Sequence, residues 1–393
     1  MPSARRRIAA LSLFAGLTAA MPAQDERALI ADASAWRSHE VGVGVTLRQR
    51  WFERLFGAPQ SLSVLEIRPG PRVRFDLEAP GRRLLTSVMG REHGALAAIN
   101  GGFFDIGNTG LSIGLLRLDG ALVVPADPQQ GSVGIDAEQR LQLAARPAGD
   151  WPEVHEALGA GPLLLRQGEV VLAAAKRDPR HPRSAIGLTA DGRVLWLAID
   201  GRTAQATGMT LAETTKVLQA LGCTDALNLD GGGSTTLWVA GRGVCNFPCD
   251  NKRYDHAGER KVANALLVFA PAIVVVDDAA AELRGSGWQR VTATAGAHDG
   301  GFATSPAVDA RAVFRADLPF AGRWRLLVAQ PPAAPALQVE VYGDATLPGP
   351  TARGTFAAVG EIAPRAGLPT WLTLRAVAGE LKVDAVRFEQ IVD

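Results

Sequence analysis

Runs of apolar residues separated by short polar turns make strands the main predicted element of this chain. Before residue 270, the runs that read as strands are residues 41–46, 62–67, 73–77, 95–99, 161–165, 181–189, 194–200, 226–230, 236–239 and 261–269. Helical periodicity predicts two helices, over residues 84–93 and 210–221, the second opened by a capping box of Thr210 and Glu213. Many strands with few helices predict an α+β domain with a mixed sheet over residues 40–270.

The pattern changes after Pro271. Residues 273–393 consist of short alternating runs with several Pro and Gly and no strong helical pattern. Six of these runs predict strands, over residues 291–295, 310–314, 324–329, 338–341, 371–376 and 383–388. This part therefore reads as a separate all-β sandwich domain over residues 273–393, in which no cluster of titratable residues stands out.

One stretch brings polar side chains to the end of a predicted strand. A period of two places Leu227 and Leu229 on one face and Asn228 and Asp230 on the other. The next four residues are Gly231, Gly232, Gly233 and Ser234. Glycines allow a ligand to approach the backbone, and successive N–H groups in such a turn can bind an anion. The alternative is a plain Gly-rich turn between two strands.

The same arrangement occurs earlier in the chain. The buried strand over residues 95–99 runs into Asn100, Gly101 and Gly102, and Asp105 follows two phenylalanines. Alone, this would read as a strand-to-loop turn with a hydrophobic plug. Its second occurrence favours a site on which both glycine loops converge.

A third polar pair comes from a predicted hairpin. Asp191 and Gly192 lie between two apolar runs and predict a two-residue turn. That turn sets a register in which Arg183 lies opposite Asp200, on a face of mostly small side chains with room for a ligand. A structural ion pair at the sheet edge is the alternative.

Composition narrows the class of protein. The chain has 393 residues, of which 47% are hydrophobic and 21% charged, as in ordinary globular proteins. Lys and Arg number 41 against 40 Asp and Glu, so no basic excess indicates nucleic-acid binding. Three arginines, a short apolar run and small residues predict a signal peptide over residues 1–23, with an N-terminal anchor as the alternative. The mature protein is then expected in the periplasm or outside the cell, without a transmembrane segment.

Three cysteines are compatible with one disulfide in an oxidising compartment. Cys245 and Cys249 flank a short predicted loop and form the expected pair, which leaves Cys223 as a buried free thiol. A zinc site is the alternative, but no histidine stands at ligand spacing.

Several of these motifs occur together and in a fixed order. They cover residues 100–105, 181–187, 200–202, 208–211, 228–234 and 259–266. As a set, they resemble the phosphodiester glycosidase family over roughly residues 40–270. Residues 318–324 and 383–388 more weakly resemble the golvesin C-terminal, xanthan-lyase-associated domain, which implies a carbohydrate-directed accessory role.

The resemblance implies hydrolysis of a sugar-1-phosphodiester, such as one of N-acetylglucosamine, at the anomeric C–O bond. The expected carboxylates are Asp230, Asp200 and Asp105, one of which stabilises positive charge or activates water. Phosphate would be held by Arg183 and the glycine backbones, and the sugar or phosphate by Asn100, Asn228 and Ser234. No cofactor is expected, and a divalent cation stays open. Two alternatives are a non-catalytic glycan-binding protein of the cell envelope and a metal-dependent phosphodiesterase, for which a dense His/Asp cluster is missing.

Overall fold

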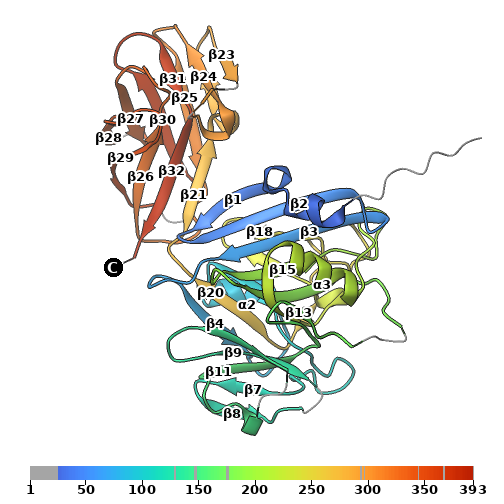
Figure 1. Cartoon of the computed structure of the whole chain (residues 1–393). Coiled ribbons are helices and arrows are strands. Elements are labelled where there is room, and N and C mark those ends of the chain that lie inside the picture. Colours follow the sequence, from blue (N-terminus) through green and yellow to red (C-terminus); the bar gives the residue numbers. More distant parts are fainter. Residues whose placement is uncertain are drawn as a thin grey trace, which may run out of the picture.

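The computed structural model describes residues 25–127, 130–145, 148–173, 177–292, 294–295, 297–343, 345–365 and 368–392. These residues contain three α-helices, α1 (Glu26–Ala31), α2 (Thr86–Glu92) and α3 (Leu211–Ala220), and are otherwise mostly β-structure (Figure 1). The predicted β-rich fold with few helices is confirmed, although every strand pairing recorded in the described part is antiparallel. The predicted signal peptide, residues 1–23, lies outside the described residues. No helix in the described part is long and apolar enough to cross a membrane.

The largest sheet has eight strands. Their order is β1 (Arg37–Gly42), β2 (Val45–Leu55), β3 (Ala58–Ile67), β15 (Val194–Ile199), β14 (Arg183–Thr189), β16 (Cys223–Asn228), β12 (Leu163–Arg166) and β13 (Glu169–Val170). One face of this sheet packs against α1 and α3. Its residues Leu197 and Ile199 share a core cluster with Val217 of α3. The other face, which carries Trp196 and Leu227, packs into a second core.

Three smaller sheets complete this part of the chain. A five-stranded sheet has the order β18 (Gly243–Val244), β17 (Leu237–Val239), β6 (Ala97–Asn100), β20 (Ala265–Phe269) and β4 (Arg74–Glu78). Another has the order β10 (Leu141–Ala144), β9 (Gly131–Ile135), β11 (Glu156–Ala160), β7 (Leu116–Leu118) and β8 (Ala121–Val124). The short strands β19 (Lys261–Val262) and β5 (Leu84–Leu85) pair with each other.

The stretch of three glycines connects two of these sheets. Strand β16 before it belongs to the eight-stranded sheet, and the glycines themselves begin a 3-10 turn, Gly232–Ser234. Strand β17 after it pairs with β6 and β18 rather than returning along β16. The glycine loop therefore lies where the two sheets meet.

One predicted turn and some predicted strand boundaries differ from the structure. Thr189 and Arg193 close a three-residue loop, with Thr189 N–H bonded to Arg193 O at 3.0 Å, so Arg183 lies opposite Ile199 and not Asp200. A shift by one residue reverses the face of every side chain, so Arg183 and Asp200 point to opposite faces of the sheet. Two predicted runs are also not single strands. The run over residues 41–46 is split because β1 ends at Gly42 and β2 begins at Val45, and the run over residues 261–269 is split because β19 ends at Val262 and β20 begins at Ala265 in another sheet.

Residues after Pro271 form their own sheets. The strands are β21 (Ile273–Asp277), β22 (Glu282–Arg284), β23 (Gln289–Thr292), β24 (Gly301–Ser305), β25 (Arg311–Ala316), β26 (Arg323–Ala329), β27 (Leu337–Val341), β28 (Ala345–Pro348), β29 (Phe356–Ile362), β30 (Thr370–Ala376), β31 (Leu381–Val383) and β32 (Ala385–Ile391). Their sheets have the orders β21-β32-β26-β29, β22-β25-β30-β27-β28 and β23-β24-β31. Four of the six predicted runs coincide with strands. The run over residues 291–295 overlaps β23 only at residues 291–292, with residue 293 outside the described residues, and the run over residues 383–388 extends from the end of β31 into β32. In Figure 1 this part, orange to red, meets the rest of the chain beside β1, where Arg387 pairs with Glu40 at 2.6 Å.

Candidate active site

The structure brings the two glycine loops together. The Asn100 side-chain amide donates to the Asp230 carbonyl oxygen at 2.7 Å, and the Asp230 N–H donates to the Gly101 carbonyl oxygen at 3.0 Å. Strand β6 therefore delivers one loop and β16 the other to the same place. Of the predicted site residues, Asn100, Gly101, Gly102, Asn228 and Asp230 and the loop of residues 231–234 gather here.

Asparagine side chains hold this junction. Asn100 is fully buried, and its side-chain oxygen accepts from Ser184 Oγ at 2.7 Å and from Thr236 N–H at 3.1 Å. Asn264, between β19 and β20, accepts from Gly102 N–H at 2.7 Å. Because the polar atoms of Asn100 already have protein partners, this residue positions the loops and does not face a ligand.

Asn228 has one polar atom to spare. Its Nδ2 donates to the carbonyl oxygens of Gly161 at 2.9 Å and Leu229 at 2.7 Å. Its side-chain oxygen is buried and has no hydrogen-bond partner in the part of the chain that the structure describes. Buried polar atoms are normally satisfied, so this oxygen is a candidate acceptor for a sugar hydroxyl or a water molecule.

Each glycine of the loop allows another segment to approach closely, and two of the three make room for an arginine. A Cβ on Gly231 would lie 2.8 Å from the Pro182 carbonyl oxygen and 3.8 Å from Arg183 Cδ. Gly232 has φ +64°, and a Cβ there would lie 3.0 Å from an Nη atom of Arg202.

At Gly233, a Cβ would overlap the Arg260 guanidinium and the Asp250 carboxylate. The absence of side chains at Gly232 and Gly233 therefore lets Arg202 and Arg260 reach the loop from two different segments, while Gly231 allows the close approach of the Pro182 backbone.

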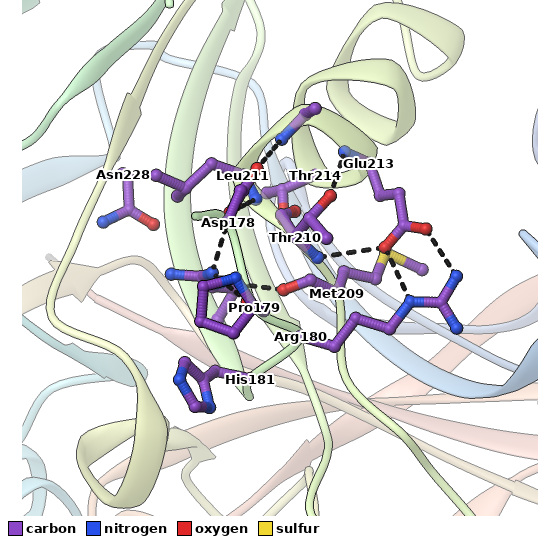
Figure 2. A network of polar contacts seen from close by, with 12 residues as sticks. Asp178, Pro179, Arg180, His181, Met209, Thr210, Leu211, Glu213, Thr214 and Asn228 are labelled. Atoms are coloured by element: carbon purple, nitrogen blue, oxygen red, sulfur yellow. Dashed lines mark hydrogen bonds and ion pairs between the residues drawn. The ribbon is translucent and has the colours of Figure 1, made fainter. Parts of the chain in front are cut away.

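The segment that carries Arg183 is fastened to the start of α3. Arg183 Nε donates to the Met209 carbonyl oxygen at 2.9 Å, and its Nη2 donates to the Pro179 carbonyl oxygen at 2.8 Å. Figure 2 shows Asp178 beside the first turn of α3, where its carboxylate accepts from Leu211 N–H at 2.8 Å. The same carboxylate lies 3.4 Å from Arg183 Nη2.

A second cap fixes the same turn. Thr210 Oγ1 accepts from Glu213 N–H at 3.0 Å and Glu213 accepts from Thr210 N–H at 3.0 Å, so the predicted capping box is confirmed (Figure 2). Glu213 also receives Arg180 Nε at 3.0 Å. These contacts hold residues 178–183 against the helix, and that arrangement places His181 and Arg183 beside the glycine loop.

The three arginines differ in their partners. Arg260 forms two bonds with Asp250, at 2.7 and 2.8 Å, and Arg183 pairs with Asp178. Arg202 contacts His181 Nδ1 at 3.3 Å and forms no ion pair with any carboxylate among the described residues.

Burial, reinforced by Arg202 and Arg183, lowers the pKa of His181. The imidazole is therefore neutral at pH 7, and the positive charge of Arg202 stays available to an anion.

Asp230 is the carboxylate of this loop. It is partly buried, and desolvation raises the pKa of its carboxyl group, while Ser234, the Gly231 N–H and Arg260 lower it. The Ser234 hydroxyl lies near enough for this effect but makes no hydrogen bond with a described residue. A carboxyl group with a raised pKa beside a ligand-accessible loop suits proton transfer.

The other two predicted carboxylates have structural contacts. Asp200 is 1% exposed and accepts from Ser61 Oγ at 2.6 Å and Phe247 N–H at 2.7 Å; burial raises its pKa to about 6. Asp105 accepts from Thr109 N–H at 3.0 Å and Oγ1 at 3.1 Å, and the backbone bond lowers its pKa. Both carboxylates therefore have hydrogen-bond partners within the protein, and a catalytic role for either of them stays a prediction.

The predicted disulfide is wrong. Cys245 and Cys249 are both free in the structure, as is Cys223, whose free state was predicted. Cys245 Sγ lies 3.4 Å from the Gly243 carbonyl oxygen, whereas Cys249 Sγ lies 4.0 Å from Arg202 Nη1. The two thiols have separate surroundings, although the loop between them is short.

A pocket of about 690 Å³ adjoins the Asp200 network. Its lining includes Ser61, which binds Asp200, and a stack of three rings on one loop. Phe247 stacks on Tyr254 with centroids 3.9 Å apart and on His256 at 4.3 Å. Stacked rings of this kind are suited to contacts with a flat sugar or ring face.

Comparison with known proteins agrees with this geometry. The sequence model of the phosphodiester glycosidase family matches residues 93–269. These residues therefore resemble a phosphodiester glycosidase domain. The matched span contains both glycine loops, all three arginines and Asp230. The family match therefore covers the candidate active site.

Individual relatives of this domain are distant. A prophage-derived uncharacterized protein of Bacillus subtilis, YomE, is 37% identical over 97 residues, which are 25% of this chain and 14% of that protein. A hypothetical protein from Synechocystis has a TM-score of 0.50 at 19% identity, covering 58% of this chain and 62% of the other. The catalytic domain of zebrafish N-acetylglucosamine-1-phosphodiester α-N-acetylglucosaminidase, auto-inhibited by its pro-peptide, has a TM-score of 0.49 at 22% sequence identity. The match covers 61% of this chain and 84% of the zebrafish chain. The chain thus spans under two thirds of the first two proteins.

Sequence reasoning missed several residues of the glycosidase domain's site. His181, Arg202 and Arg260 stood inside motifs that carried the family resemblance, but they received no role. A usable signal existed in Arg202 and Arg260, which stand in motifs that accompany the glycine run, since guanidinium groups and glycine N–H groups both bind anions.

Proposed function

We propose that this protein is an exported glycosidase that hydrolyses a sugar-1-phosphodiester, of the N-acetylglucosamine-1-phosphodiester type, at the anomeric C–O bond. The phosphodiester glycosidase family supports a glycosidase-type hydrolase for residues 93–269. One observation carries the finer proposal: the guanidinium groups of Arg202 and Arg260 lie against a glycine loop next to a partly buried carboxyl group with a raised pKa.

The arginines and glycines suit the phosphodiester group. Guanidinium groups bind phosphate oxygens through paired N–H donors, and glycine N–H groups add donors at close range. Arg202 is the arginine without a carboxylate partner in the described residues, so its charge is free to meet the charge of the substrate. As the anomeric bond breaks, negative charge grows on the departing phosphodiester, and this cluster is placed to stabilise it.

Asp230 suits the sugar side of the reaction. A phosphodiester is already a good leaving group, so protonation of the departing oxygen contributes little. An ionised carboxylate at the loop stabilises positive charge at the anomeric carbon or accepts a proton from attacking water. Its raised pKa makes it a better base than an exposed Asp, while the positive charge of Arg260 favours its ionised form.

The rest of the chain fits a protein acting on glycans outside the cytoplasm. We propose export directed by residues 1–23, to the periplasm or the outside of the cell. We also propose that residues 273–393 are a β-sandwich domain that directs the enzyme to carbohydrate, for which the alternating burial of β25, β26 and β27 is the support.

The test is turnover of synthetic sugar-1-phosphodiesters by the purified chain in water labelled with heavy oxygen. The proposal predicts release of free sugar with the label on the sugar. Label on the phosphate would indicate a phosphodiesterase and contradict the proposal. Saturable binding of the same compounds without turnover would instead indicate a glycan-binding protein.

A further inference from the structure

Three carboxylates gather at the start of the C-terminal part. Asp277 ends β21, Asp278 opens a 3-10 turn, Asp278–Ala280, and Asp384 stands just before β32. One oxygen from each lies within 4.8 Å of the others. Asp278 and Asp384 are each 1% exposed. The expectation that this part holds no titratable cluster was wrong, because Asp384 is far from the other two in the sequence.

Half of the six carboxylate oxygens of this cluster lack hydrogen-bond donors among the described residues. Asp277 Oδ1 accepts from Ala279 N–H at 2.9 Å, and both Asp384 oxygens accept the His298 N–H at 3.0 Å. In contrast, Asp277 Oδ2 and both oxygens of Asp278 are buried and receive no hydrogen bond from any described residue. A buried anion without donors is strongly unfavourable unless something else neutralises it.

The protein supplies too little positive charge for this. Arg290 is the cation that pairs with the cluster, with Nη2 3.0 Å from Asp278 Oδ2. Three carboxylates against one guanidinium leave a net charge of minus two.

We propose that Asp277, Asp278 and Asp384 bind a divalent cation of the Ca²⁺ type. Carboxylate oxygens are the ligands that Ca²⁺ prefers, and its flexible coordination needs no ideal geometry. An open cavity of about 510 Å³ adjoins Asp277 and Asp278, so further oxygen ligands from water have room to bind. A second set, formed by Asp277, His298 and Asp299, also brings one ligand atom from each residue within 4.8 Å of the others, and it is the competing zinc-type set that the test distinguishes.

The cation would connect the two ends of this part of the chain. Asp278 N–H already donates to the Asp384 carbonyl oxygen at 2.7 Å, and β21 pairs with β32. A cation shared by their side chains would therefore tie the entry of the C-terminal part to its final strand. Its effect is on stability and is separate from catalysis at Asp230.

The test uses the full chain in thermal unfolding, with excess CaCl₂ or with EDTA. The proposal predicts that Ca²⁺ raises the Tm of the C-terminal transition by at least about 5 °C. Asp278→Asn should lose this response and, because it removes one repelling charge, should have a higher Tm than wild type in EDTA. Asp317→Asn, an exposed acid 3.2 Å from Arg315, is the matched control and should keep the wild-type response.

Direct binding distinguishes the outcomes. Titration calorimetry with Ca²⁺ should give one site in wild type and none in Asp278→Asn. Asp277→Asn, which keeps the acceptor for Ala279 N–H, should bind at least tenfold more weakly and serves if Asp278→Asn does not fold. Equal wild-type Tm in Ca²⁺ and EDTA with no heat of binding would overturn the proposal. So would a site that responds only to Zn²⁺ and depends on His298.

Discussion

Arg202→Ala is the substitution that isolates the anion-binding part of the site. Removing Arg183 or Arg260 would leave Asp178 or Asp250 without its partner, whereas Arg202 has no carboxylate partner in the described part of the chain. Arg202 has φ +64°, and alanine carries the same Cβ there, so the substitution leaves the backbone strain unchanged. The lost protein contacts are those to His181 and to Cys249 Sγ.

The expected loss follows from the strength of one charged hydrogen bond. Hydrogen bonds to charged groups contribute about 1.5–3 kcal/mol, and each 1.4 kcal/mol is roughly a factor of ten. Arg202→Ala should therefore lower kcat/KM for a sugar-1-phosphodiester by about 10–150-fold. The pKa of His181 should also rise toward 6.5, because the charge of Arg202 lowers it in the wild type.

The assay compares two substrates of the same sugar. Steady-state hydrolysis of the phosphodiester is measured beside that of an uncharged aryl glycoside, with a thermal unfolding curve for each protein. The large loss should be confined to the phosphodiester. Arg68→Ala removes an exposed arginine that pairs with Glu66 at 3.6 Å and should leave both rates within about twofold. Equal losses on both substrates, or a phosphodiester loss below about threefold, would refute the anion-clamp reasoning.

Further substitutions separate structural from catalytic residues. Asp200→Asn should keep kcat within about threefold, since Asn can accept the same backbone bond; a loss of about 100-fold would restore Asp200 as catalytic. Burial raises the pKa of Asp200 from 3.8 to about 6, so its stabilising contribution is present below pH 4 and lost as the pH rises through 6. Asp200→Asn should remove that slope from a plot of Tm against pH. Asp105→Asn should keep activity within about threefold in the same assay, and a larger loss would return Asp105 to the site. Gly102→Ala would place a Cβ on the Gly159 carbonyl oxygen and should lower the free energy of unfolding in urea by about 1–3 kcal/mol, whereas Gly107→Ala, in open space, should not.

Local features of the fold could be predicted from the sequence. The capping box at Thr210, the buried free thiol of Cys223 and four of the six C-terminal strand runs depend on residues close together in the chain. The two polar strand ends at Asn100 and Asp230 were also recognisable, because strand parity and glycine placement are local properties.

Register and tertiary partners could not be predicted in the same way. The Asp191-Gly192 turn is compatible with two- and three-residue loops, and the backbone pairing of Thr189 with Arg193 decides between them. Arg202 and Arg260 meet the glycine loop only after segments remote in sequence have folded together. For the same reason, the sequence did not reveal that the Asp200 carboxylate accepts hydrogen bonds from Ser61 Oγ and the Phe247 N–H.

The most direct test of the central claim is the kcat of Asp230→Asn on a sugar-1-phosphodiester that the wild-type protein hydrolyses. Asn keeps the shape of the side chain, while the backbone bonds of Asp230 with Asn100 and Gly101 are unaffected. If Asp230 acts on the anomeric carbon or on attacking water, kcat should fall by about 100-fold or more with an unchanged unfolding curve. A variant that folds normally and retains near wild-type kcat would contradict the account.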